Sequence, residues 1–308
     1  VIFKIYYSTP IELAYDALAK WHISTLLVET GDWGLLTINQ HVARWAIVVP
    51  QFLVAVLLPG RYEGYYLLPI VLSSLTVVVF CYVLRRFLGL PAGFVILFSV
   101  LMCVEPLNQL LSSQLSPQTF GLFFSGMGVL FGLWYIENSN FRCLVTAAVF
   151  FFLAYGAHVS FLAGSLGFLL FLLINRRQSI GSFVFISTLI GCLAVETLVF
   201  NILSDWVYWG GRLQLLKNWG SEISVADHYL SESPRRGSLT LSDLTIFRWR
   251  LLPYYNKLAL LALVLISVSW LIPRFRRQVS PALKLLAYIA ILFAGVVSFA
   301  IIEVFPVR

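Results

Sequence analysis

Three ionisable residues near the N-terminus have the spacing of a single helix face. Thr9, Pro10 and Glu12 fit the N-cap, first and third positions of a helix, which is a capping-box pattern. Glu12, Asp16 and Lys20 then follow one turn apart on the polar face. In a structural interpretation, Glu12 caps the helix, Asp16 pairs with Lys20 and the face is solvated. In a chemical interpretation, Glu12 or Asp16 accepts a proton from an acceptor hydroxyl or holds a metal ion.

Two other polar residues lie in apolar surroundings. Glu196 falls within the apolar run 181–204, about two turns from its end, where an ionisable group costs ~2.5–3.5 kcal/mol on insertion scales. It is either a functional carboxylate facing a wet cavity or a hydrogen-bonded residue between helices. His158 lies between two apolar runs, and is either a ligand or an ordinary polar residue at the membrane interface.

The segment 205–255 combines cations with aromatic rings. Arg212 and Lys217 lie among tryptophans that include Trp206 and Trp219. Basic side chains can hold a diphosphate or a lipid phosphate, while the rings stack on a sugar or lie at the membrane interface. Simple interfacial anchoring is the alternative interpretation.

The chain lacks the short motifs of several enzyme classes. No GxxxxGK[ST], GxGxxG, HExxH, GxSxG or CxxC pattern occurs, so nucleotide hydrolysis, dinucleotide redox chemistry and zinc proteolysis have no sequence support. The four cysteines lie in or beside apolar runs, as packing residues do. We therefore predict no protein metal site.

The composition is that of a membrane protein. The 308 residues are 60% hydrophobic and 11% charged, with a mean hydropathy of +0.88. A water-soluble domain has roughly 25% charged and about 45–50% apolar residues. We attribute the net charge of +7 to membrane topology and expect no nucleic-acid partner.

Apolar stretches that could cross a ~30 Å hydrocarbon core recur along the chain. They predict about eight helices, near 65–84, 90–104, 116–136, 143–157, 159–175, 181–204, 256–273 and 281–303. A shorter run, 45–59, contains Pro50 and is expected to lie in the interface or to re-enter. The predicted fold class is all-α, a polytopic membrane helix bundle with external amphipathic helices. An external region, 1–64, precedes a transmembrane domain, 65–308, which has an external loop at 205–255.

Basic residues mark alternate connections between these helices and therefore predict the cytoplasmic side. They occur at Arg85, Arg86, Arg142, Arg176, Arg177, Arg274, Arg276 and Arg277. Of the 14 acids, Glu137 alone falls in a cytoplasmic connection and Glu196 alone in the interior of a span. Because long polar segments gather on the opposite face, we expect function there.

The order of these features resembles the GT-C class of polyprenyl-phosphate-sugar-dependent glycosyltransferases, including protein O-mannosyltransferase and aminoarabinose transferase relatives. The resemblance covers most of the chain and rests on Ile11-Glu12-Leu13-Ala14-Tyr15-Asp16-Ala17, Leu58-Pro59-Gly60, the segment 68–89 and Phe305-Pro306-Val307-Arg308. It implies a GT-C-like fold. It also implies that the family's first helix precedes Val1, so we expect a longer protein, truncated here at both ends.

The resemblance further implies an inverting displacement, in which a carboxylate takes the acceptor proton while the lipid phosphate leaves. Glu12 is implied as the base and Asp16 as the assisting acid. The implied substrate-binding residues are Tyr15, His158, Glu196, Arg212, Lys217 and Arg308, of which Arg212, Lys217 and Arg308 hold phosphate. The implied partners are membrane lipid and a polyprenyl-phosphate-linked sugar donor. The cofactor is unknown, although some members of the class use a divalent cation.

Two positions depart from the family pattern. Ile11 stands where the family has its catalytic base, and Gln118 stands about where many relatives have a second acid. Either the catalytic carboxylate has shifted to Glu12 or Asp16, or this chain has lost transfer activity. The alternatives are a non-catalytic subunit of a complex with other membrane subunits and a secondary transporter coupled through Glu196. The absence of an Asn-x-Ser/Thr sequon favours a bacterial inner (plasma) membrane over the endoplasmic reticulum.

Overall fold

The fold is built from helices throughout the part that the structure describes. A computed structural model describes residues 15–37, 43–104, 112–174, 179–203, 280–290 and 292, and these are 88% helical with no strand. Three of the helices are long and apolar enough to cross a membrane: α4 (Glu63–Arg86), α7 (Pro117–Asn138) and α10 (Ser179–Leu203). The predicted all-α class is therefore confirmed for this part of the chain, and these three helices fit predicted membrane spans in length and composition.

The other apolar helices lie where the sequence predicts them, and the described part of each has 10–17 residues. They are α3 (Trp45–Leu57), α5 (Ala92–Val104), α8 (Phe141–Ala157), α9 (Leu162–Ile174), which follows the 3-10 turn η3 (Val159–Phe161), and Pro281–Ala290. Both ends of α3 are described, and at about 1.5 Å per residue this 13-residue helix is roughly 20 Å long, too short to cross the hydrocarbon core by itself. The predicted span 256–273 and the loop 205–255 lie outside the described residues.

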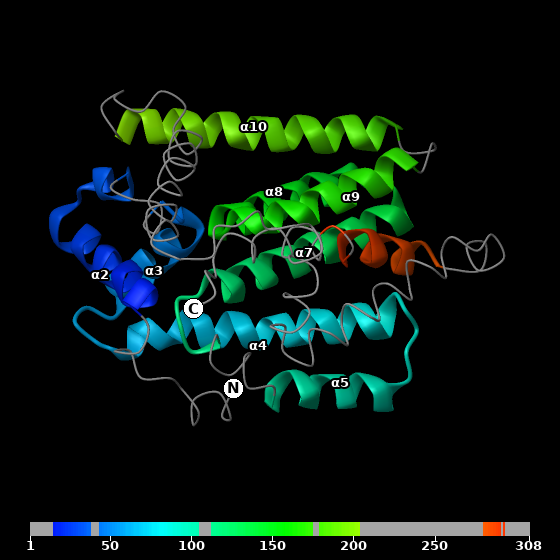
Figure 1. The fold of residues 1–308 in the computed structure, drawn as a ribbon, viewed down its shortest axis with the longest axis horizontal. Coiled ribbons are helices and arrows are strands. Elements are labelled where there is room, and N and C mark those ends of the chain that lie inside the picture. The colour runs from blue at the N-terminus through cyan, green and yellow to red at the C-terminus, as the bar shows by residue number, and fades with distance from the viewer. Residues whose placement is uncertain are drawn as a thin grey trace, which may run out of the picture.

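The helices α4, α5, α7, α8, α9 and α10 run side by side with alternating direction, whereas α2 (Tyr15–Thr30) and α3 gather at one end of this bundle (Figure 1). The short 3-10 helix η2 (Trp33–Thr37) joins them there. Contacts are most extensive between α7 and α8, and α8 also packs against α10. The predicted short run at 45–59 is thus a helix packed on the bundle end, with Pro50 inside it.

The two larger apolar clusters among the described residues fill opposite halves of the bundle. One joins Leu133 of α7, Phe151 of α8 and Phe168 of α9. The other joins Trp21 of α2 and Ile47 of α3 to Phe120 of α7. Because the second cluster includes side chains from α2 and α3, these helices are part of the core rather than loosely attached to it.

The end of the bundle opposite α2 and α3 carries exposed basic residues, here called the basic end. Arg85 and Arg86 close α4, and Arg142 opens α8. The Arg86 guanidinium donates to both carboxylate oxygens of Glu137, at 3.1 and 3.2 Å. Glu137, the acid predicted to lie in a basic connection, therefore joins the end of α7 to the end of α4.

Replacing Glu137 with glutamine is expected to have a small effect on stability. The pair is solvent-exposed, at 54% and 34% of the two side chains, and exposed ion pairs contribute about 0.2–1 kcal/mol. The apparent melting temperature in detergent should fall by about 1–3 °C at low salt, and the difference should shrink in 0.5 M salt. A larger, salt-independent loss would contradict this surface role.

Candidate functional site

The buried stripe of α2 contains two polar residues. Ala17, Trp21 and Leu27 are buried at helical spacing, and Lys20 and Ser24, both 0% exposed, lie in the same stripe. The interpretation of a solvated polar face is therefore wrong for Lys20. Burial of a lysine requires a compensating partner, and Lys20 does interact with another group.

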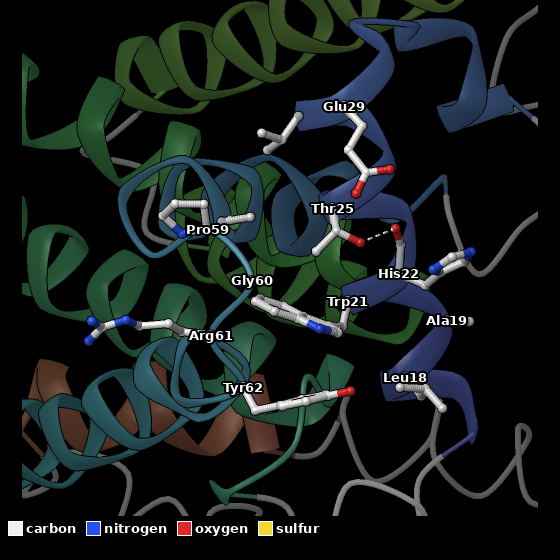
Figure 2. A pocket seen from close by; sticks show the side chains of 12 residues that line it. Leu18, Ala19, Trp21, His22, Thr25, Glu29, Pro59, Gly60, Arg61 and Tyr62 are labelled. Atoms are coloured by element: carbon white, nitrogen blue, oxygen red, sulfur yellow. Dashed lines mark hydrogen bonds between the residues drawn. The ribbon is translucent and has the colours of Figure 1, made fainter.

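The side of α2 next to this stripe forms one wall of an open groove of about 640 Å³. The other wall is the turn from α3 to α4, with Pro59, Gly60, Arg61 and Tyr62 (Figure 2). We call this space the α2 groove. It lies at the bundle end opposite the basic end, where α4 begins.

The Trp21 side chain forms the floor of the α2 groove and packs closely against α4. Trp21 is 7% exposed and lies edge-on to Tyr65, with ring centroids 6.3 Å apart. A Cβ on Gly64 would come within 3.0 Å of the Trp21 ring. Gly60 allows the turn itself, because its φ of +68° favours glycine.

The walls of the α2 groove offer a carboxylate, hydroxyls and an aromatic ring. Thr25 and Glu29 follow His22 on one side of α2, and the Thr25 hydroxyl donates to the His22 carbonyl at 2.7 Å. In Figure 2 the Glu29 carboxylate points toward Thr25, the Tyr62 hydroxyl points toward α2, and Arg61 extends outward at the rim. Such a lining can hydrogen-bond a polyol and cover its apolar face with an aromatic ring.

Sequence reasoning missed the α2 groove. His22, Thr25 and Glu29 have a spacing that places them on one side of a helix, and this was the only local signal. Nothing in the sequence places Tyr62 opposite them, because that proximity depends on how α2 packs against α3 and α4.

Glu196 is not among the residues lining the α2 groove. It is 7% exposed, and its Oε1 accepts a hydrogen bond from Trp45 Nε1 at 2.6 Å. Of the two interpretations from the sequence, this contact supports a hydrogen-bonded residue between helices. A role for Glu196 in substrate binding stays a prediction.

His158 ends α8 and is half-buried. Its Nδ1 accepts the Ser160 backbone N–H at 3.2 Å and lies 2.8 Å from the Ser160 hydroxyl. Because a backbone N–H can only donate, Nδ1 is unprotonated here and the ring proton is on Nε2. The local turn gives His158 a structural role, and its contact with substrate stays a prediction.

The remaining predicted site residues lie at or beyond the edge of the description. Tyr15 and Asp16 are in the first turn of α2, and helical periodicity places Asp16 one turn before Lys20. Glu12, Arg212, Lys217 and Arg308 lie outside the described residues. Within the described ranges, no group of three His, Cys, Asp or Glu side chains could hold a metal ion. Comparison of the chain with protein-family models, curated proteins and solved structures gave no match.

Proposed function

We propose that this protein is a polytopic membrane glycosyltransferase that moves a sugar from a polyprenyl-phosphate donor to an acceptor at the non-cytoplasmic surface of a bacterial inner membrane. In this proposal Glu12 is the base and Asp16 assists it. Arg212, Lys217 and Arg308 hold the phosphate of the leaving lipid. The membrane bundle is a GT-C-like scaffold for these groups.

The observation that carries the proposal is the α2 groove. It combines an aromatic wall residue, Tyr62, with the carboxylate of Glu29 over a fixed tryptophan floor. Its position opposite the basic end supports a non-cytoplasmic location, because basic residues favour the cytoplasmic side. The helix that carries Glu29 also carries Asp16 in its first turn, so one rigid element can align a bound sugar with a catalytic carboxylate.

The α2 groove is tested by measuring sugar transfer in proteoliposomes as a function of donor concentration. Because hydrogen bonds to charged groups contribute about 1.5–3 kcal/mol, Glu29→Gln should raise the KM for the donor roughly tenfold with little change in kcat. Tyr62→Leu should act in the same direction. The matched control is Glu63→Gln, an exposed acid that does not line the groove, and it should behave like wild type.

Three results would separate this proposal from its alternatives. Unchanged KM values for both groove variants would remove the α2 groove from the reaction. Stable co-purification with fixed partners and no transfer would favour a non-catalytic subunit. A pH-dependent solute flux that is lost in Glu196→Gln would favour a secondary transporter.

A further inference from the structure

One hydrogen bond joins two helices whose residues are far apart in the sequence. Trp45, the first residue of α3, donates from Nε1 to Glu196 Oε1 of α10 at 2.6 Å across 151 residues of chain. Glu196 lies in a helix long and apolar enough to span a membrane and is 7% exposed. A carboxylate in such a position needs a partner, and the indole N–H provides one.

The Trp45 ring is held in the orientation that this bond requires. Its centroid lies 5.5 Å from that of Phe152. On the adjacent turn of α8, a Cβ at Gly156 would approach the Trp45 ring to 2.9 Å. Gly156 therefore leaves room for the indole, and the ring is packed against α8 while its N–H reaches α10.

The helix that Trp45 anchors is connected to both walls of the α2 groove. At its far end, Ala55 lines the groove and the chain continues into the turn with Tyr62. In the first turn of α3, the Val48 carbonyl accepts a hydrogen bond from the Ser24 hydroxyl of α2 at 3.3 Å. Next along α3, Gln51 Nε2 donates to the Gly64 carbonyl of α4 at 2.8 Å. A displacement of α3 would therefore displace both walls of the α2 groove.

We propose that the Trp45–Glu196 contact sets the position of α3 on the bundle and thereby the shape of the α2 groove. Glu196 is then a positioning residue that acts through Trp45 and does not itself touch the sugar donor. This inference rests on the proposed function in one respect only, namely that the donor binds in the α2 groove. The contact between α3 and α10 can be measured without any transfer activity.

The test compares spin-label distances between Leu57 at the end of α3 and Ile190 on α10. Both side chains are exposed, at 77% and 60%, and the labels are attached to cysteines in a background without the four native cysteines. Glu196→Leu and Trp45→Phe should each shift or broaden the distance distribution. Glu196→Gln keeps an acceptor oxygen and should therefore retain the wild-type distance distribution. The double variant Trp45→Phe/Glu196→Leu should be no worse than either single variant, because both remove the same bond.

The same variants should change donor binding in parallel. Trp45→Phe and Glu196→Leu should raise the KM for the donor about tenfold, with kcat little changed and with Glu196→Gln close to wild type. Trp134→Phe, which alters a tryptophan of the other apolar cluster, is the matched control and should change neither measurement.

Two outcomes would overturn the inference. Unchanged distances in both Trp45→Phe and Glu196→Leu would show that apolar packing alone positions α3. Shifted distances with an unchanged KM would show that α3 does not control the groove. If wild-type protein transfers no sugar, the proposed function fails, while the distance measurement still decides whether this contact positions α3.

Discussion

The double variant Glu12→Gln/Asp16→Asn is expected to lose sugar transfer by about 10²–10⁴-fold, the usual contribution of a positioned general base. Both substitutions preserve the size of the side chain and remove its ability to accept a proton as a carboxylate. The loss should therefore appear in kcat at saturating donor rather than in KM. The measurement is the initial rate of transfer from a polyprenyl-phosphate sugar in proteoliposomes.

The two single variants and one control show which carboxylate is responsible for the loss of sugar transfer. If Glu12 is the base, Glu12→Gln alone should account for most of the fall in kcat, and Asp16→Asn should have a smaller effect. Glu29→Gln serves as the comparison because this carboxylate lines the α2 groove and should change KM instead. Unchanged transfer in the double variant would eliminate the proposed base.

Replacing Gly121 with alanine is expected to give the largest loss of stability among single methyl additions to α7. A Cβ at Gly121 would overlap the ring of Phe161, which is 3% exposed and so has little room to move. Overpacking of this kind typically costs 1–3 kcal/mol, and roughly 1 kcal/mol of that is offset by alanine's better helix propensity. The net cost of roughly 1 kcal/mol should lower the apparent melting temperature in detergent by about 2–4 °C.

Gly191→Ala is the matched control, since it is also a glycine within an apolar helix. A Cβ at Gly191 meets nothing within 4 Å, so the substitution should leave the melting temperature unchanged or raise it slightly. Phe161→Leu combined with Gly121→Ala should be less destabilised than the sum of the two single variants, because the smaller side chain relieves the overlap. Equal melting temperatures for Gly121→Ala and Gly191→Ala would contradict the close packing of α7 against η3.

The sequence predicted helix positions well because the length of an apolar stretch is a local property, and the structure adds local caps at the starts of two of these helices. Ser116 and Pro117 begin α7 as an N-cap and first residue, and the Ser116 hydroxyl accepts the Gln118 N–H at 3.2 Å. Asn140 begins α8 in the same way, accepting the Arg142 N–H at 2.9 Å. Each of these signals lies within three residues of the helix start that it determines, so no knowledge of distant contacts is needed.

The sequence was less informative about which polar residues are buried. Helical spacing alone groups Lys20 with Asp16 on a solvated face, yet Lys20 is 0% exposed. The face of α2 that points inward is selected by the neighbours against which it packs, among them α3. Spacing along one helix does not specify those neighbours.

By itself, therefore, the sequence determined an all-helical, membrane-type chain, the approximate helix positions and the grouping of basic residues such as Arg86 with Glu137. These properties follow from composition and from spacing over a few turns. Only the tertiary structure decided that Glu29 and Tyr62 face one groove, that Lys20 is buried and that Trp45 bonds Glu196. Those results depend on contacts between segments as much as 151 residues apart, which are fixed by the packing of whole helices.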